Sequence, residues 1–299
     1  MKGEARRFSA FAKVNLSLHV LGKRPDGYHD ISSLMMTVDL ADRLAVRRLP
    51  SEIVLECDSP EVPPGVENLC VRAALRLKEK CRVREGAEIT LEKAIPVAAG
   101  LGGGSSDAAC TLVGLNALWG LGLTDQELEG IASDIGSDVP FFVRGGAQIA
   151  QGRGERLTPV GDFPELWLVI VVPPLKVSSA WAYSVAPAGV GKMRLTTPEH
   201  ENRMIPLTVR VDAAGVSRSL WNDLEGGVIQ KHPAVRELKD ALVHLGALGS
   251  LMSGSGPSVF GVARDRFSAI AIASSMSRPG LSVFSVRSSS KGWVEAGHI

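Results

Sequence analysis

Cysteine is scarce in this sequence and shows no spacing typical of a metal or redox site. The four cysteines are Cys57, Cys70, Cys81 and Cys110, with no C-x-x-C pair among them. Zinc ribbons and thioredoxin-like motifs need such pairs, and no histidines stand at ligand spacing beside these residues. The pattern favours reduced thiols, as in a protein of the cytosol.

Long apolar runs and an N-terminal targeting segment are also missing. The longest apolar stretch, Leu166–Val172, fits a buried strand and is too short to cross a bilayer. The N-terminus has no apolar signal-peptide core, and a transit peptide would not fit before Ala10. We therefore expect a cytoplasmic protein of a bacterium, with no membrane as partner.

An excess of charge of one sign is the third absence. The chain has 33 lysine and arginine residues against 32 aspartate and glutamate residues. Short basic clusters such as Arg47-Arg48 fit a solvated surface, and no global basic field would recruit nucleic acid. We expect a small-molecule partner and no nucleic acid. No heptad or large apolar stripe marks an interface, so the sequence leaves the oligomeric state open.

The length and the element pattern predict two domains. With 299 residues and 45% hydrophobic residues, the chain is long enough for two cores. The Pro- and Gly-containing segment Thr158–Pro164 predicts a boundary, with domains of residues 1–161 and 162–299. Mixed strand and helix patterns indicate an α+β fold class.

Hydrophobic periodicity predicts the individual elements. Strands are expected at 8–20, 31–38, 44–49, 53–57, 88–91, 167–172 and 281–286. Helices are expected at 68–79, 108–119, 235–245 and 267–275, and from the Thr124–Glu127 capping box to near Gly136. SDVPFFVRGGAQIAQGRGE predicts a turn, an apolar strand and a glycine-flanked hairpin, and LMSGSGPSVFGVA predicts strand–turn–strand.

The most informative segment is the glycine-rich stretch Pro96–Ala109, PVAAGLGGGSSDAA. A strand-like run precedes it and a helical run follows it. A strand, a glycine turn and a helix start form an arrangement that binds phosphate, because glycines adopt positive φ and the first helical N–H groups lack partners.

Two well-known phosphate loops do not match this stretch. A P-loop needs a lysine after its last glycine, and this segment has none. A dinucleotide fingerprint needs a glycine where Ser105 stands. The remaining alternative is an ordinary turn with Ser105 or Ser106 as N-cap and Asp107 in the first helical turn. Four glycines in five residues favour phosphate binding, and Asp107 could attract a metal that accompanies the phosphates.

Several polar residues outside the loop are candidates for chemistry. Lys13 and Asn15 project from the same side of a strand, which indicates a polar pocket, although an edge-strand lysine has the same pattern. The local sequence around Asp138 fits a functional carboxylate and a turn aspartate equally well. Tyr28 and His29 follow a turn and form either a platform for a ring or surface decoration. SGSG at 253–256 is a hairpin turn or a second anion-contacting edge.

Three segments in this order resemble the GHMP small-molecule kinase superfamily: AKVNL, PVAAGLGGGSSDAA and MSGSGPSVF. The opening AKVNLSLHVLGKRPDGYHDISSLM, with IGSDVPFFVRGGAQIAQGRGE and WNDLE, is similar to the members that phosphorylate cytidine diphosphate-linked methylerythritol in the non-mevalonate isoprenoid pathway. The resemblance covers most of the first 160 residues and becomes sparse in the C-terminal half.

The resemblance implies a two-domain chain with the site in the cleft between the domains. It implies a ribosomal-protein-S5-like N-terminal domain and a ferredoxin-like C-terminal domain. The implied reaction transfers the ATP γ-phosphate to the 2-hydroxyl of the methylerythritol moiety, with Mg²⁺ as second cofactor. It assigns no metal ligands.

The resemblance also implies roles for individual residues. Asp138 matches the catalytic aspartate and Lys13 its cationic neighbour. Asn15, Tyr28, His29 and Tyr183 match acceptor-binding residues, and Trp181 beside Tyr183 leaves open which ring stacks on the cytosine. Asn68 and Lys93 match residues near the adenine. The phosphate loop corresponds to Pro96, Val97, Ala98, Ala99, Gly100, Leu101, Gly102, Gly103, Gly104, Ser105 and Ser106.

Two other functions remain compatible with the sequence. One is a GHMP kinase for another small alcohol, such as mevalonate or homoserine. The other is a nucleotide-binding module without turnover, against which the presence of both Lys13 and Asp138 argues.

Overall fold

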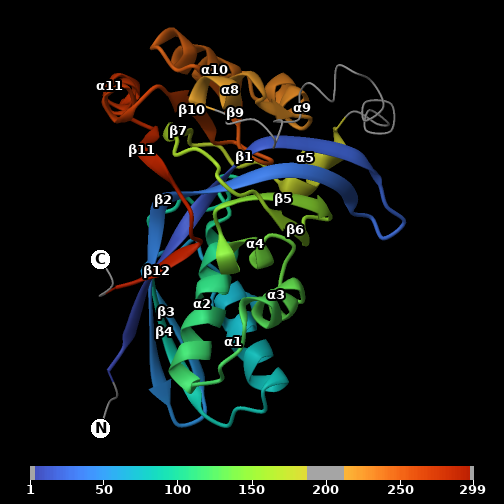
Figure 1. Cartoon of the computed structure of the whole chain (residues 1–299), viewed down its shortest axis with the longest axis vertical. Coiled ribbons are helices and arrows are strands. Elements are labelled where there is room, and N and C mark those ends of the chain that lie inside the picture. Colours follow the sequence, from blue (N-terminus) through green and yellow to red (C-terminus); the bar gives the residue numbers. More distant parts are fainter. Residues whose placement is uncertain (1–3, 187–211, 297–299) are drawn as a thin grey trace.

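A computed structural model of the chain describes residues 4–186 and 212–296 (Figure 1). The first half contains β1 (Arg6–Lys23), β2 (His29–Leu49), β3 (Ile53–Cys57), a 3₁₀ turn (Gly65–Glu67), α1 (Leu69–Lys80), β4 (Gly86–Glu92), α2 (Gly103–Trp119), α3 (Asp125–Ser133), α4 (Val139–Arg144), β5 (Ala147–Gly152) and β6 (Arg156–Pro159).

The second half continues with further strands and helices. They are β7 (Trp167–Val172), α5 (Ser179–Ser184), α8 (Ala213–Arg218), β8 (Trp221–Asn222), α9 (Glu225–Lys231), α10 (Ala234–His244), β9 (Gly249–Met252), β10 (Val259–Ala263), α11 (Arg266–Met276), β11 (Ser282–Ser289) and β12 (Trp293–Glu295). No described helix is both long and apolar enough to span a bilayer.

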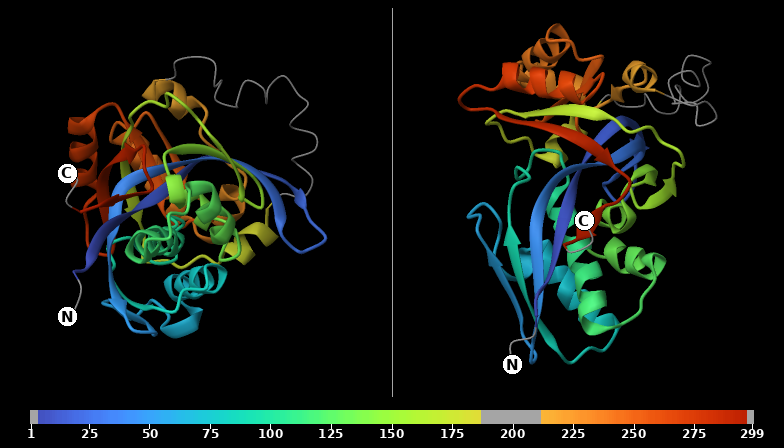
Figure 2. Two further views of the ribbon diagram at one scale, coloured as in Figure 1. Left: turned by 60° about the horizontal axis from the view of Figure 1, so that its bottom comes forward. Right: turned by 60° about the vertical axis from the view of Figure 1, so that its left-hand side comes forward.

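One sheet runs through both halves of the described chain. Its main path is β12-β1-β2-β11-β7-β10-β9, and β2 also pairs with β4 and β5. The long antiparallel β1–β2 hairpin projects beyond the body of the molecule (Figure 2). The sequence predicted two strands at 31–38 and 44–49, whereas β2 is one strand. A register shift opposite Phe11 and Ala12 absorbs the break in alternation between Val38 and Ala41.

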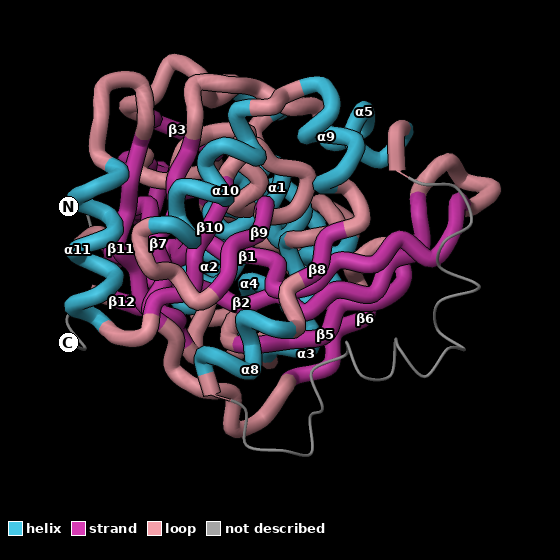
Figure 3. The backbone as a smooth tube through the Cα atoms, turned by 90° about the horizontal axis from the view of Figure 1, so that it is seen from above, coloured by secondary structure: helices cyan, strands magenta, loops and turns pink. Residues whose placement is uncertain are grey.

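Helices cover the sheet in two groups. In the first half α2 packs against β1 and β2, α1 packs against β3, and α4 packs on α2; in the second half α10 and α11 pack against β7, β9, β10 and β11 (Figures 1 and 3). A third buried cluster lies between the two groups and joins Val14 and Leu16 of β1 to Ile170 of β7 and Phe260 of β10. Ala99 and Leu101 of the glycine stretch belong to this cluster, so that stretch is anchored in the core where the two halves meet.

One local prediction and one alternative interpretation are wrong. The apolar residues after Asp138 form helix α4 instead of a strand, because Pro140 fits the first turn of a helix and Gly145 ends it at φ +71. Helix α2 begins at Gly103 with Gly102 as N-cap at φ +73, so neither Ser105 nor Ser106 caps it. Ser106 instead donates its hydroxyl to the Phe11 carbonyl at 2.7 Å. The predicted Asn68 N-cap and the Thr124–Glu127 capping box are confirmed.

Candidate active site

A cavity of about 1310 Å³ is lined by segments from both halves of the chain. Its wall comes from β1, the tip of the β1–β2 hairpin, the glycine stretch, the residues before α4, the β5–β6 turn, α5 and the β9–β10 turn. Twelve of the residues predicted for the site line it: Lys13, Asn15, Tyr28, His29, Ala98, Gly100, Gly102, Gly103, Gly104, Ser105, Asp138 and Tyr183. The remaining predicted residues do not line it: Asn68, Lys93, Pro96, Val97, Ala99, Leu101 and Ser106.

The glycine stretch places backbone against the cavity at the start of α2. Gly100 has φ +79, and a Cβ there would fall on the carbonyl oxygen of Ser253. A Cβ on Gly102 would lie 2.7 Å from the Phe142 ring. Both positions therefore require glycine for the backbone angle and for close packing. Gly103, Gly104 and Ser105, the first residues of α2, line the cavity. Because the first N–H groups of a helix have no partner within the helix, an anion can bind there.

The second glycine turn, between β9 and β10, packs directly on the first. The Ser253 hydroxyl donates to the Gly100 carbonyl at 3.0 Å, and the Ser258 N–H donates to the Ala99 carbonyl at 3.2 Å. Asn222 donates its amide to the carbonyls of Met252 and Gly254, each at 2.8 Å. Gly254 and Ser255 line the cavity. The SGSG segment is therefore a hairpin turn that also closes one side of the site.

Lys13 and Asn15 lie side by side in β1, as the strand period predicted. Both are buried; the Lys13 ammonium donates to the Asn15 side-chain oxygen, and the Asn15 amide donates to the Ser33 hydroxyl at 2.8 Å. The edge-strand interpretation of Lys13 is wrong, because β1 pairs with β2 there and the Lys13 N–H donates to the Leu101 carbonyl. Burial lowers the pKa of the Lys13 ammonium, and the charge of Asp138 opposes that shift.

Asp138 lies half-buried at the start of α4 and its side chain makes no helix-capping hydrogen bond. It faces the cavity, and its charge acts on both Lys13 and Tyr183. A Cβ on Gly154, in the β5–β6 turn, would lie 3.7 Å from an Asp138 carboxylate oxygen. Asp134, four residues earlier, forms a surface ion pair with Arg76 at 2.7 Å instead. The structure thus brings Asp138 and Lys13 together from segments 125 positions apart.

Two aromatic rings, those of His29 and Tyr183, also line the cavity. The rings of His29 and Tyr183 stack with centroids 5.3 Å apart and an angle of 23° between their planes. Burial, and then the charge of Asp138, raise the pKa of the Tyr183 hydroxyl, while burial and the Lys23 charge lower the pKa of His29. The Tyr183 phenol and the His29 imidazole are therefore both favoured in their uncharged forms.

Trp181, the other ring in α5, does not line the cavity. Its ring lies under the Lys231 ammonium at 4.2 Å and edge-to-face with His232. The choice that the sequence left open between Trp181 and Tyr183 therefore favours Tyr183 on geometric grounds.

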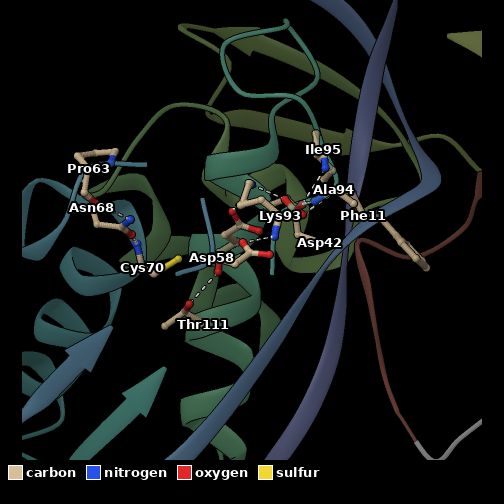
Figure 4. A network of polar contacts seen from close by, with 12 residues as sticks. Phe11, Asp42, Asp58, Pro63, Asn68, Cys70, Lys93, Ala94, Ile95 and Thr111 are labelled. Carbon is tan, nitrogen blue, oxygen red and sulfur yellow. Dashed lines mark hydrogen bonds and ion pairs between the residues drawn. The ribbon is translucent and has the colours of Figure 1, made fainter. Parts of the chain in front are cut away.

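Lys93 and Asn68 do not line the cavity, and their side chains contact other parts of the protein. The Lys93 ammonium forms ion pairs with Asp42 and Asp107, the latter at 2.7 Å (Figure 4). Asn68 accepts from the Cys70 N–H at 2.8 Å and donates to the Pro63 carbonyl. The Asp107 carboxylate is thus buried against a lysine. The described residues include no group of three or more His, Cys, Asp or Glu side chains that could hold a metal by themselves.

Two residues of this region escaped the sequence analysis. Asp42 stands next to Arg43 and three residues after Asp39, so its local sequence does not mark it as buried, and its partner Lys93 is 51 positions away. Arg153 stands between two glycines in QGRGE, and its guanidinium lies 5.1 Å from the centre of the exposed Tyr28 ring on the cavity wall.

Comparison with known proteins identifies the family. The model of the GHMP kinases N terminal domain matches residues 68–146, and that of the GHMP kinases C terminal domain matches residues 212–280. A 4-diphosphocytidyl-2-C-methyl-D-erythritol kinase of Synechococcus sp. (strain JA-3-3Ab) is 49% identical over 261 residues, 85% of this chain and 83% of the relative. The one of Gloeobacter violaceus is 42% identical over 96% of this chain and 95% of its own. The chain belongs to the 4-diphosphocytidyl-2-C-methyl-D-erythritol kinase family.

Solved structures agree with membership in this family. A crystal structure of 4-(cytidine 5'-diphospho)-2C-methyl-D-erythritol kinase matches with a TM-score of 0.77 and 36% identity, covering 94% of this chain and 98% of that one. A homoserine kinase of Cytophaga hutchinsonii matches with a TM-score of 0.80 at 20% identity, which shows the shared fold. The predicted two-domain α+β fold of a GHMP kinase is confirmed, and the chain is an ATP-using phosphotransferase of that family.

Proposed function

We propose that the protein transfers the γ-phosphoryl group of ATP to the 2-hydroxyl of 4-diphosphocytidyl-2-C-methyl-D-erythritol, a step of the non-mevalonate isoprenoid pathway. One observation carries this proposal. Lys13 and Asp138 face a single cavity that also contains a glycine loop at one side and the His29–Tyr183 stack at another. The cavity therefore offers separate places for a phosphate donor, a reacting hydroxyl and an aromatic base.

The donor phosphates bind the glycine stretch in this proposal. Phosphoryl transfer depends mostly on positioning and on stabilisation of charge. The N–H groups at the start of α2 supply fixed dipoles, and the second glycine turn holds that backbone in place. Because the stretch contains no lysine, the positive charge comes from Lys13, whose backbone N–H donates to the Leu101 carbonyl of the stretch at 2.9 Å.

Asp138 receives the acceptor hydroxyl. Its carboxylate accepts a hydrogen bond from the 2-hydroxyl, orients the oxygen toward the γ-phosphorus, and takes the proton as the new O–P bond forms. The ammonium of Lys13 offsets the charge of the transferred group. Whether proton removal or orientation contributes more to the rate depends on how early the proton leaves in a loose transition state.

Mg²⁺ fits this site as an ion delivered with the nucleotide. Magnesium is commonly held by one or two carboxylates together with substrate phosphates and water. The cavity wall offers the Ser105 hydroxyl beside the loop and the Asp138 carboxylate, which would hold it together with the ATP phosphates. When bound, the ion neutralises part of the phosphate charge.

The acceptor's cytidine diphosphate suits the aromatic end of the cavity. The Tyr183 and His29 rings provide a flat surface on which a cytosine can stack. Arg153, which lies over Tyr28 and forms no ion pair with another described residue, suits the negative diphosphate. We also propose that the reaction takes place in the cytoplasm; the four cysteines, all free, support this.

The experiment is an assay of the purified protein with ATP, Mg²⁺ and the cytidine diphosphate-linked acceptor, with the product identified by ³¹P NMR. We expect a new phosphomonoester on the methylerythritol moiety. Asp138→Asn should lower kcat by about 10²-fold or more with nucleotide affinity retained. Asp134→Asn, the same change at a surface ion pair, is the control and should be fully active. Full activity of Asp138→Asn would refute the mechanism, and no product from the wild type would refute the assignment.

A further inference from the structure

An ion pair joins the two ends of the phosphate-binding stretch. Lys93 lies just before Pro96, and Asp107 follows directly after Ser106 in α2. The Lys93 ammonium and an Asp107 carboxylate oxygen are 2.7 Å apart, although the residues are 14 positions apart in the chain. The pair closes the base of the glycine stretch.

Asp42 attaches this closure to the sheet. Its carboxylate pairs with Lys93 and also accepts the N–H groups of Ala94 and Ile95 at 2.6 and 2.8 Å (Figure 4). Asp42 belongs to β2, so the central strand of the first half holds the incoming end of the stretch. The Lys93 N–H is held as well, by the Asp58 carboxylate at 2.9 Å.

The three charged side chains lie behind the cavity wall. Asp42 and Asp107 are buried, and the Lys93 side chain is 7% exposed. None of the three lines the cavity. A Cβ on Gly103, the first residue of α2, would lie 3.3 Å from the Lys93 ammonium. The network therefore supports from behind the same backbone that faces the donor phosphates in front.

We propose that Asp42, Lys93 and Asp107 are positioning residues for the donor nucleotide, fixing both ends of the glycine stretch so that its N–H groups are held ready for the phosphates. A buried ion pair is weak evidence for stability alone, because desolvation offsets most of its attraction. The proposal rests on the proposed use of ATP and is independent of which alcohol is phosphorylated.

Two variants of Asp107 separate the contact with Lys93 from a general effect of substitution at this position. Burial, and then the charge of Asp42, raise the pKa of Asp107, and the positive charge of Lys93 opposes this shift. The thiols of Cys70 and Cys110, which face Asp107 from α1 and α2, have their pKa raised by burial and stay neutral. Asp107→Asn keeps the shape of the side chain and an oxygen that can accept a hydrogen bond from the Lys93 ammonium. Asp107→Ala removes the contact to Lys93 and leaves Asp42 paired.

The experiment measures binding of a non-hydrolysable ATP analogue by calorimetry without any acceptor. Asp107→Ala should weaken binding about tenfold, while Asp107→Asn stays within about threefold of the wild type. In turnover, KM for ATP should rise by the same factor as the binding constant, with kcat and the acceptor KM within about twofold. Asp134→Ala, which also loses an ion pair to a basic side chain, should bind the analogue like the wild type.

Three results would overturn the proposal. They are unchanged analogue binding by Asp107→Ala, equal weakening in Asp107→Asn and Asp107→Ala, or an equal rise of KM for both substrates. If Asp107→Ala does not fold, Lys93→Arg keeps the charge but moves it relative to Gly103. It should weaken binding at least about threefold, and wild-type affinity would overturn the proposal. Because binding is measured without an acceptor, a wrong acceptor assignment leaves the test intact.

Discussion

Lys13 is a buried cation whose charge the proposed reaction requires. Its ammonium contacts Asn15 and lies near Asp138, and bulk water reaches little of it. Burial lowers its pKa, since the charged form loses hydration that the Asp138 carboxylate only partly replaces. Lys13 therefore loses its proton at a lower pH than an exposed lysine does.

The pH dependence of the rate should reveal this shift. As pH rises through the lowered pKa, the ammonium becomes a neutral amine and stabilisation of the transferred phosphoryl group is lost. We expect kcat to fall on the alkaline side at a lower pH than that at which exposed lysines titrate. Lys13→Arg should be slower but keep a flat alkaline limb, because a guanidinium stays charged. A wild-type kcat that is constant up to the titration range of exposed lysines would contradict this.

Tyr183 and Trp181 offer a matched pair for the acceptor site. Both belong to α5, but only Tyr183 lines the cavity and stacks on His29. Tyr183→Ala should raise KM for the acceptor about tenfold, since one base–aromatic stack contributes about 1–3 kcal/mol, and leave KM for ATP unchanged. Trp181→Ala should leave both constants near wild type. Steady-state kinetics with each substrate varied decides between the two rings, and the reverse pattern would assign the stacking to Trp181.

At the residue scale, the sequence predicted those placements that depend only on neighbouring residues in the chain. The strand period places Lys13 beside Asn15, and the turn before Tyr28 places that residue at a hairpin tip. The pairing of Lys93 with Asp42 follows from no local pattern, because it depends on where β2 and the segment after β4 meet in the fold. Arg153 was missed for the same reason, since its contact with Tyr28 joins two separate turns.

The two glycine turns act as one element of the site. Gly100 and the β9–β10 turn are in contact through the Ser253 hydroxyl and carbonyl, so the backbone that meets the donor phosphates is positioned by the second half of the chain. Asn222, in the WNDLE motif, holds the β9–β10 turn from behind. The motif therefore supports the site without lining its cavity.

Alanine at Gly100 should separate close packing from backbone strain. Gly100 and Gly122 both have positive φ, but only Gly100 meets another backbone, whereas a Cβ on Gly122 meets nothing within 4 Å. Gly122→Ala should cost roughly 1–2 kcal/mol of unfolding free energy from strain alone. Gly100→Ala should cost about 1–3 kcal/mol more, because the Ser253 turn must move, and should also raise KM for ATP. Equal costs in denaturant unfolding would show that the turns do not depend on this contact.

The local sequence did not predict helix α4 or the start of helix α2 correctly. The run VPFFV has the composition of a strand, but Asp138 in helical geometry and Pro140 in the first turn make it α4. The helix after the glycine stretch begins five residues earlier than its apolar pattern, because Gly103 and Gly104 are helical despite their low propensity. Tertiary packing of that first turn against Ile95 outweighs propensity there.

At the scale of the whole molecule, the halves share a sheet. Strand β2 pairs with β11, and β12 returns to pair with β1. The Trp293 indole donates to the Val143 carbonyl at 2.8 Å, which attaches the C-terminal strand to α4 of the first half. We propose a domain boundary between residues 161 and 162. It separates the sequence motifs of the two halves, whereas the sheet continues from one half into the other.

This continuity predicts one cooperative unfolding transition. Because the buried cluster that contains Val14 and Phe260 belongs to both halves, separating them would expose apolar surface on each. Calorimetry should show a single peak, and Trp293→Ala should move the whole peak to lower temperature. Two resolved peaks, only one of which moves in that variant, would show that the halves fold independently.

The central claim concerns the identity of the acceptor, and a comparison of kcat/KM for three alcohols tests it most directly. The purified protein would be assayed with ATP and Mg²⁺ on the cytidine diphosphate-linked methylerythritol, on mevalonate and on homoserine, with CMP as competitor. We expect efficient turnover of the first alone and competition by CMP against that substrate. Turnover of mevalonate or homoserine that is indifferent to CMP, or nucleotide binding with no product from any of the three, would contradict the account.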